Sequence, residues 1–188
     1  MYLSKDNPET VGIAGTFLGS GKVGVIACDT IYGICGRVPD TEGRIRDIKG
    51  REDIKPFIIL FPDIEGILEI AASPLDPVLT GLWPGPLTVI IPKRGGGTVG
   101  VRIPDDEFTL SILRAAGIPL YSTSVNRSGE APLWRISEIA DGFSGSVDFI
   151  VDGGDMQGKT ASTIVDVTVR PFRIIRQGAC VLPPSLFT

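Results

Sequence analysis

Short runs of β-branched and other apolar residues recur along the chain, each bounded by a turn signal or by a helical segment. Continuous apolar runs of this length are typical of strands that are buried on both faces of a sheet. Strands alternate with helices at first and follow one another near the end. The pattern therefore predicts an α/β domain with a mixed, twisted sheet, close to an α+β mixture. The predicted strands cover residues 23–28, 57–61, 87–91, 100–103, 119–122, 147–151, 162–167 and 172–175.

Helical segments are predicted between several of these runs. Asn7 followed by Pro8 and Glu9 is typical of a helix start, and Gly19 can end that helix, so we expect a helix over 8–19. The other expected elements are helices over 41–48, 63–72, 107–116 and 135–142, a helical turn near 77–82 and a glycine-punctuated loop over 29–38.

The composition excludes several kinds of protein. The 188 residues are the length of one domain, 1–188, and 43% of them are apolar, which is enough for a core. The chain has no histidine, which excludes Ser-His-Asp and Cys-His catalytic sites and HExxH metal sites. The net charge of −4 does not favour indiscriminate binding of nucleic acid or of anionic membranes, although a local basic site stays open.

The cysteines and the N-terminal segment indicate the cellular setting. Cys28, Cys35 and Cys180 form an odd set without a CxxC spacing, so neither a disulfide framework nor a zinc site is expected. The first sixteen residues lack the apolar stretch of a signal peptide, and no segment has the ~18 consecutive apolar residues of a membrane helix. We therefore expect a cytoplasmic protein without a membrane partner.

Basic residues concentrate between Arg37 and Lys55. One interpretation is a solvated helix face, because acidic residues are interleaved with the basic ones. The other is an anion site in which Lys49 and Arg51, alternate residues after a helix, point at the same polyanion.

Two polar clusters follow predicted strands. Residues 122–129, with the sequence STSVNRSG, come directly after the strand at 119–121, and hydroxyls and amides at the carboxyl end of a strand are typical ligand-binding groups. An ordinary turn rich in Ser, Asn and Gly is the alternative. In the second cluster, Ser162 and Thr163 precede Arg176, which again combines hydroxyls with a guanidinium.

Eight motifs, taken in order, resemble the YrdC-like family, and together they span nearly the whole chain. The resemblance implies a single domain in which a large, twisted, mixed sheet with flanking helices surrounds a concave, positively charged cavity. The motifs are Asp29-Thr-Ile-Tyr-Gly33, Lys49-Gly-Arg51, Trp83-Pro-Gly-Pro-Leu-Thr88, Val101-Arg-Ile-Pro104, Ser122 to Gly129, Asp152-Gly-Gly154, Ser162 to Thr168 and Arg176-Gln-Gly178.

The same resemblance implies an enzyme, L-threonylcarbamoyladenylate synthase, which is a nucleotidyltransferase. It would convert L-threonine, bicarbonate or CO2, and ATP into threonylcarbamoyl-AMP and pyrophosphate, with Mg2+ accompanying ATP. The product would pass to tRNA-modifying proteins that make threonylcarbamoyl-adenosine, and local RNA binding is a further expectation. The reaction mainly requires anions to be collected and aligned, so the absence of histidine does not exclude it.

Residue roles follow from the same resemblance. The implied catalytic residues, which also bind ATP, are Lys49, Arg51, Ser124 and Asn126. Ser162 and Arg176 would add contacts to ATP. The threonine side would be lined by Cys28, Thr30, Tyr32, Arg102 and Ser122.

The chain also departs from the family pattern. Many members have threonine where this chain has Cys28, and histidines where it has Leu60 and Asp106. A thiol is a weaker hydrogen-bonding group than a hydroxyl, so the amino-acid specificity stays open. The chain ends soon after Gly178, so we expect no further C-terminal domain.

Two alternative functions stay open. One is a divergent nucleotide- or RNA-binding module without synthase activity, and the other is a carbamoyl-transfer domain of hydrogenase maturation, which usually belongs to a larger chain. Two of the motifs have simple structural interpretations: a rigid corner with a buried indole at Trp83 to Pro86, and a tight turn at Asp152 to Gly154.

Overall fold

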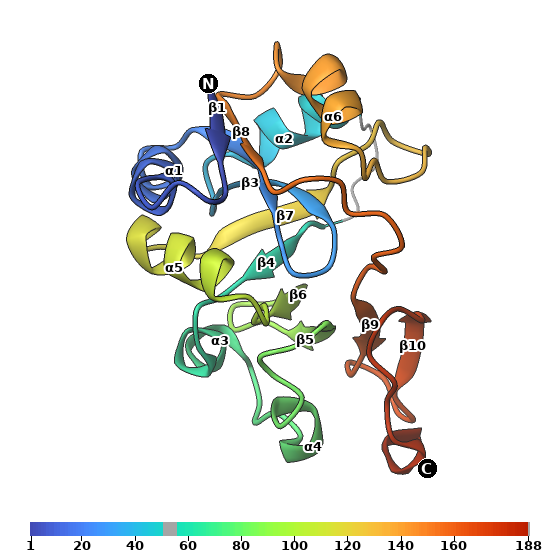
Figure 1. The fold of residues 1–188 in the computed structure, drawn as a ribbon. Coiled ribbons are helices and arrows are strands. Elements are labelled where there is room, and N and C mark those ends of the chain that lie inside the picture. The colour runs from blue at the N-terminus through green and yellow to red at the C-terminus, as the bar shows by residue number, and fades with distance from the viewer. Residues whose placement is uncertain (51–55, 188) are drawn as a thin grey trace.

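A single sheet of ten strands forms the centre of the fold. The computed structural model describes residues 1–50 and 56–187. In space the strands follow the order β1-β8-β2-β3-β7-β4-β6-β5-β9-β10 (Figure 1). Their bounds are β1 Tyr2–Ser4, β2 Val23–Ala27, β3 Tyr32–Arg37, β4 Ile58–Leu60, β5 Leu87–Pro92, β6 Thr98–Arg102, β7 Leu120–Ser124, β8 Phe149–Asp152, β9 Thr163–Asp166 and β10 Arg173–Arg176.

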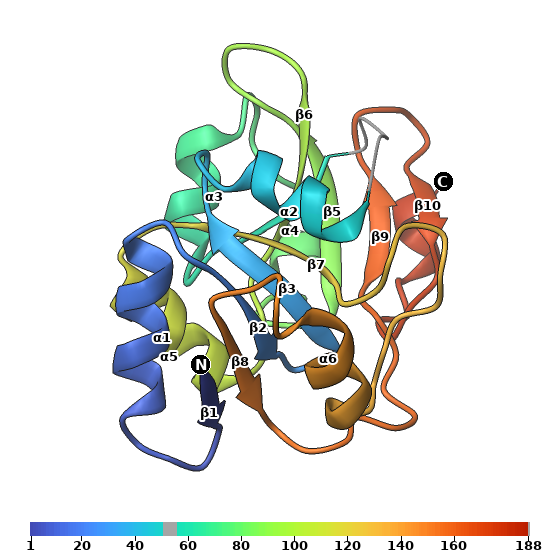
Figure 2. The same cartoon turned by 90° about the horizontal axis from the view of Figure 1, so that it is seen from above.

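The sheet is mixed, as the sequence predicts. β8 pairs in parallel with β1 and β2, β4 with β6, and β5 with β9. The pairs β2–β3, β3–β7, β4–β7, β5–β6 and β9–β10 are antiparallel. The last hairpin, β9–β10, forms one end of the sheet, far from α1 and α5 in both views (Figures 1 and 2).

Helices flank the sheet. α1 and α5 lie side by side, and α1 also contacts β2 and β3 (Figure 2). α2 contacts β3 and ends at Gly50, whose φ of 59° gives a left-handed cap. The helices are α1 Thr10–Gly19, α2 Glu42–Lys49, α3 Ile64–Ile70, α4 Pro77–Thr80, α5 Glu107–Ala116 and α6 Ile136–Phe143, with a 3-10 turn at Pro184–Phe187. No helix in the described ranges is long and apolar enough to cross a membrane.

Most of the predicted elements are confirmed within a few residues, and three differ. The segment 29–38 is not a loop throughout, because Tyr32–Arg37 form the buried strand β3. Its glycines are used for close packing, since a Cβ on Gly36 would lie 2.4 Å from the Thr41 hydroxyl oxygen. The first helix begins at Thr10 instead of residue 8, because the Asn7 carboxamide caps a preceding turn by accepting from the Glu9 amide at 3.0 Å. The sequence pattern did not predict β1.

Glycines in α1 generate a test of this packing. A Cβ on Gly15 would lie 2.4 Å from the Ala115 Cβ of α5, whereas a Cβ on Gly12 meets nothing within 4 Å. We expect Gly15→Ala to lower the free energy of unfolding by about 1–3 kcal/mol through overpacking. Gly12→Ala, in the same helix, should raise it by roughly 0.5–1 kcal/mol through helix propensity. Urea denaturation measures both, and equal effects of the two variants would contradict the packing.

Candidate functional site

A cavity of about 460 Å³ lies on the part of the sheet that runs, in spatial order, from β3 through β7, β4, β6, β5 and β9 to β10. Most of the predicted site residues line it. Those that line it are Cys28, Thr30, Tyr32, Arg102, Ser122, Ser124, Ser162 and Arg176. Two arginines and one aspartate, Asp29, are the charged residues of the described lining. The predicted excess of positive charge stays a prediction for the complete cavity, because Arg51 and Lys55 lie outside the described residues.

Arg102, on β6, is the most constrained of these cations. Its side chain is 6% exposed, and it forms an ion pair with Asp29 through Nη2. Nη1 donates to the Thr30 hydroxyl at 2.9 Å and Nε donates to the Gly85 carbonyl at 3.0 Å. A buried guanidinium needs such partners to offset its desolvation. The contacts hold the loop after β2 and the corner at residues 83–86 against β6.

Asp29 has one carboxylate oxygen in use and one without a partner. Oδ2 accepts from Arg102 and from the Asp105 amide, the latter at 3.0 Å. Oδ1 is buried and has no hydrogen-bond partner within the described part of the chain. An unsatisfied buried carboxylate oxygen is costly, so it marks a place where a ligand cation or a donor would be stabilised.

Arg176, on β10, supplies a second guanidinium to the cavity. Its Nε and Nη2 donate to the Ser162 carbonyl at 3.1 and 2.8 Å, and Nη2 also reaches the Ser162 hydroxyl at 3.2 Å. Ser162 in turn shares a hydrogen bond of 2.9 Å with Thr88, which is fully buried. Partial desolvation of its guanidinium inside the cavity, and then the nearby positive charge of Arg102, lowers the pKa of Arg176, although the residue as a whole is exposed. Two guanidinium groups in one cavity favour an anionic ligand.

The turn after β10 holds Arg176 in place. The Thr163 hydroxyl donates to the Cys180 carbonyl at 2.6 Å and accepts from the amides of Gly178 and Cys180 at 2.9 and 3.1 Å. A Cβ on Gly178 would lie 2.2 Å from the Ala161 carbonyl oxygen, so only glycine fits there. This accounts for the Arg176-Gln-Gly178 motif: glycine lets the turn close on β9, and the closed turn fixes the arginine.

Lys49, Ser124 and Asn126 are bonded to one another. The Lys49 ammonium donates to the Ser124 carbonyl at 2.7 Å, to the Asn126 carbonyl at 3.1 Å and to Asn126 Oδ1 at 2.9 Å. Ser124 Oγ donates to the same Oδ1 at 2.6 Å, and Asn126 Nδ2 donates to the carbonyls of Arg127 and Glu130. We call these three residues the clasp. It ties the end of α2 to the segment that follows β7.

Of the three clasp residues, only Ser124 lines the cavity. Lys49 is 4% exposed and Asn126 is 7% exposed, and neither is among the residues that line the cavity. Arg51, the fourth member of the predicted tetrad, lies outside the described residues. Direct contact of these side chains with ATP therefore stays a prediction.

Two thiols and a hydroxyl meet above Gly33 at the floor of the cavity. A Cβ on Gly33 would lie 2.9 Å from Ser122 Oγ, 3.5 Å from Cys35 Sγ and 3.6 Å from Cys28 Sγ. Interaction with the Cys35 thiol, and then burial, raises the pKa of Cys28 well above its usual range, and interaction with the Cys28 thiol lowers the pKa of Cys35. Cys28 is therefore a neutral thiol at pH 7, suited to packing and weak hydrogen bonding.

Two further motifs have structural roles. The Tyr32 hydroxyl donates to the Gly154 carbonyl at 2.7 Å and accepts from the Gly153 amide at 2.9 Å, which pins the turn after β8. The Trp83 indole donates to the Leu87 carbonyl at 2.7 Å and is 9% exposed. The tight turn and the buried-indole corner are both confirmed. The phenol of Tyr32, which lines the cavity as predicted, is committed to that turn.

Sequence reasoning did not find the apolar wall of the cavity. It is formed by side chains of separate strands and loops, and β4 contributes alternate residues to it. The signal was present only as the pleat of each strand, which turns every second residue to one face. The residues of this wall are Ile31, Phe57, Ile58, Leu60, Ile90, Ile164 and Ile175.

Comparison with known proteins identifies the family. A model of the Sua5, YciO and YrdC proteins, described as "Telomere recombination", matches residues 16–178. The chain belongs to the Sua5/YciO/YrdC family. The matched segment, residues 16–178, covers most of the chain and includes every predicted site residue.

Relatives in the Sua5/YciO/YrdC family carry a specific name. The threonylcarbamoyl-AMP synthase of Pyrococcus abyssi is 31% identical over an alignment of 183 residues, which covers 89% of this chain and 54% of that protein. The Bacillus subtilis enzyme of that name is 27% identical over an alignment of 196 residues, which covers 93% of this chain and 56% of that protein. The chain thus spans a little over half the length of these curated relatives.

Solved structures of the family share the fold. P. abyssi Sua5 complexed with L-threonine superposes with a TM-score of 0.86 at 28% identity, over 95% of this chain and 57% of that one. Escherichia coli YciO has a TM-score of 0.83 over 100% of this chain and 98% of that one, and at 24% identity it supports the fold alone. The predicted family and the mixed-sheet fold are therefore confirmed.

The clasp generates a stability prediction. Lys49→Met keeps the length of the side chain but removes the ammonium bonds to the carbonyls of Ser124 and Asn126 and to Asn126 Oδ1, which keeps only its bond from Ser124 Oγ. We therefore expect a loss of about 1–3 kcal/mol in the free energy of unfolding. The Ser128 amide, which donates to the Lys49 carbonyl at 2.9 Å, should exchange its hydrogen faster. Lys22→Met, at an exposed lysine, is the control. Denaturation and hydrogen exchange that are alike in the two variants would refute the clasp.

Proposed function

We propose that this protein is a threonylcarbamoyl-AMP synthase, a nucleotidyltransferase that acts on ATP, L-threonine and bicarbonate or CO2. The observation that carries the proposal is the convergence of Arg102, Arg176 and a row of hydroxyls in one cavity. P. abyssi Sua5, which was solved with L-threonine, supports the same assignment. The product would serve tRNA-modifying proteins in the cytoplasm, with direct binding of RNA as a further part of the proposal.

The two ends of the cavity suit different substrates. Arg176 and Ser162 would hold a phosphate of ATP, with Ser124 of β7 as a further hydroxyl of the same cavity and the apolar wall against the adenine. Lys49 and Asn126 would support Ser124 through the clasp, and Arg51 would add a cation. Thr30, Ser122, Tyr32 and Cys28 surround the threonine end. There the N–H groups of Arg102 that are not bonded to any described residue would meet the threonine carboxylate.

In the proposed reaction the threonine amine adds to CO2 and loses a proton, which gives a carbamate. A carbamate oxygen then attacks the α-phosphorus of ATP, the bond between the α- and β-phosphates breaks, and pyrophosphate leaves. The residues of the chain align the two anions and offset their mutual repulsion, which is the main requirement of such transfers.

Mg2+ would accompany ATP, where it would neutralise phosphate charge. Mg2+ is commonly bound by one or two carboxylates together with substrate phosphates and water. The buried Oδ1 of Asp29, which lacks a partner among the described residues, would be such a carboxylate ligand for Mg2+.

Pyrophosphate release by purified protein with ATP, Mg2+ and bicarbonate tests the proposal. We expect release that depends on L-threonine and is much weaker with L-serine. ATP binding without threonine-dependent release would instead support a nucleotide-binding module.

Arg176 can be tested against a neighbour on the same strand. Arg176→Met removes a charge-assisted contact of about 1.5–3 kcal/mol, so kcat/KM for ATP should fall roughly ten- to a hundred-fold. Arg173→Met, at an exposed position of β10 outside the cavity, should leave it unchanged. Equal kinetics for the two variants would remove Arg176 from the site.

Cys28 tests the fit of the threonine end. Cys28→Thr places a stronger hydrogen-bonding group at the cavity floor, so the KM for L-threonine should stay the same or fall. Cys180→Ala, at a buried cysteine that does not line the cavity, is the control. A rise in KM confined to Cys28→Thr would mean that the pocket is fitted to the thiol.

A further inference from the structure

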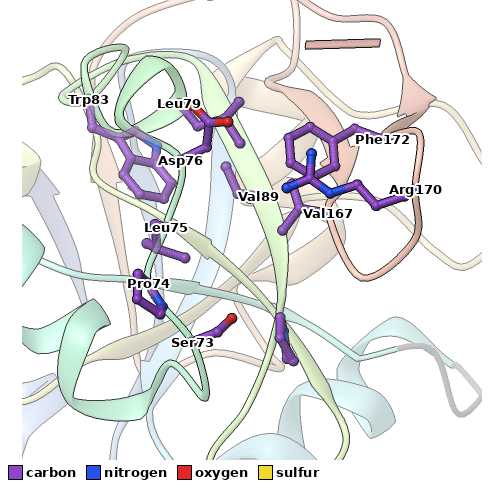
Figure 3. Close-up of a pocket in the computed structure, with 11 residues that line it drawn as sticks. Ser73, Pro74, Leu75, Asp76, Leu79, Trp83, Val89, Val167, Arg170 and Phe172 are labelled. Carbon is purple, nitrogen blue, oxygen red and sulfur yellow. The ribbon is translucent and has the colours of Figure 1, made fainter. Parts of the chain in front are cut away.

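A second cavity lies behind the sheet, on the face opposite the candidate site. It measures about 180 Å³ and opens between the segment 73–83 and the turn that joins β9 to β10 (Figure 3). Val89 of β5 faces this cavity, whereas the next residue, Ile90, faces the candidate site. Successive residues of a strand point to opposite faces, so a single layer of β5 separates the two cavities.

The floor of the second cavity is apolar and preformed. Leu79, Val89 and Phe172 are each at most 5% exposed, and Trp83 is 9% exposed. Because the Trp83 N–H is already bonded to the Leu87 carbonyl, its indole offers the cavity only apolar ring surface. The volume is below the roughly 300–1,000 Å³ of pockets for drug-sized ligands, so it suits a small metabolite.

Opposite charges stand at two sides of this floor. Figure 3 shows Asp76 and Arg170 across the cavity from each other, with Val89 and Val167 between them. They form no ion pair with each other. The Asp76 side chain accepts from the Val78 amide through Oδ1 at 2.9 Å, which is the one hydrogen bond of that carboxylate within the described ranges.

Arg170 is oriented, yet none of the described residues gives it a polar partner. Its guanidinium stacks on the Phe172 ring at 3.9 Å, and it has no hydrogen bond or ion pair to any residue that the structure describes. Stacking uses the face of the guanidinium and leaves the N–H groups at its edge available. Such an edge matches a carboxylate in bidentate geometry.

We propose that this second cavity binds a free α-amino acid with an apolar side chain. The α-carboxylate would meet Arg170, the α-ammonium would meet Asp76, and the side chain would cover Trp83 and Leu79. A zwitterion satisfies both charges, whereas a simple fatty acid or a simple amine satisfies only one. The inference does not rest on the proposed synthase reaction, because no residue of the candidate site takes part.

L-leucine, 4-methylpentanoic acid and L-leucinamide separate the two charges experimentally. Each is titrated into the full-length, ¹⁵N-labelled protein, and binding is followed by amide chemical shifts. We expect L-leucine to shift amides of residues 73–83 and 167–172, and to bind roughly tenfold or more tightly than either analogue, since each analogue lacks one charge-assisted contact.

Matched variants assign the charges. Asp76→Asn keeps the helix cap of α4, because asparagine caps as well as aspartate does, and it removes the charge. Asp76→Asn and Arg170→Gln should each weaken L-leucine binding roughly tenfold or more, whereas Arg173→Gln should not. Pyrophosphate release should be unchanged in all three variants without added leucine, which keeps this test separate from that of the synthase.

Three outcomes would overturn the proposal. The first is no shift at any L-leucine concentration up to its solubility. The second is equal binding of L-leucine and 4-methylpentanoic acid together with no effect of Asp76→Asn, which would mean a carboxylate site only. The third is a set of shifts confined to the candidate site around Thr30 and Ser162.

Discussion

The buried guanidinium of Arg102 is the interaction around which the candidate site is built. Its partners come from the loop after β2 and from the corner that precedes β5, so one side chain holds three segments that are far apart in sequence. Removing one member of a buried charge pair is strongly destabilising, because the remaining charge is left without compensation. The position of the cavity wall at Thr30 and the integrity of the sheet at β6 therefore depend on the same ion pair.

Much of the fold follows from local sequence signals. The helix over 107–116 is correct to the residue, because the Asp106 side chain caps its start and Gly117 ends it in a left-handed conformation. The strand β3 was wrongly predicted as a loop because Gly33 and Gly36 are typical of turns. Here the requirement is tertiary: the Ser122 and Thr41 hydroxyls occupy the space that side chains would fill. β1 depends on pairing with β8, nearly 150 residues away, which no local pattern reports.

The candidate site was predictable to the extent that residue chemistry identifies it. The polar clusters pointed to Ser122, Ser162 and Arg176, the family resemblance added Arg102, and all four line one cavity. Which of these side chains remain available to a ligand was not predictable, because that depends on which hydrogen-bond donors are already bonded to other protein groups. Lys49 carries an ammonium group, which is a common phosphate ligand, but in the structure this ammonium donates to three protein oxygens. Thr88 lies behind Ser162, where only the three-dimensional contact shows its role.

The position of β10 has a consequence for how the site opens. β10 is the last strand of the sheet, it pairs with β9 alone, and its four residues are exposed, yet it carries Arg176. Peripheral elements with few buried contacts open at lower free energy than the centre of a sheet. The wall that bears Arg176 is therefore the part of the cavity that we expect to open locally at the lowest free energy. An anion held by Arg176 adds to the few contacts that keep the hairpin closed, so occupancy of the site and local order of the hairpin are thermodynamically linked.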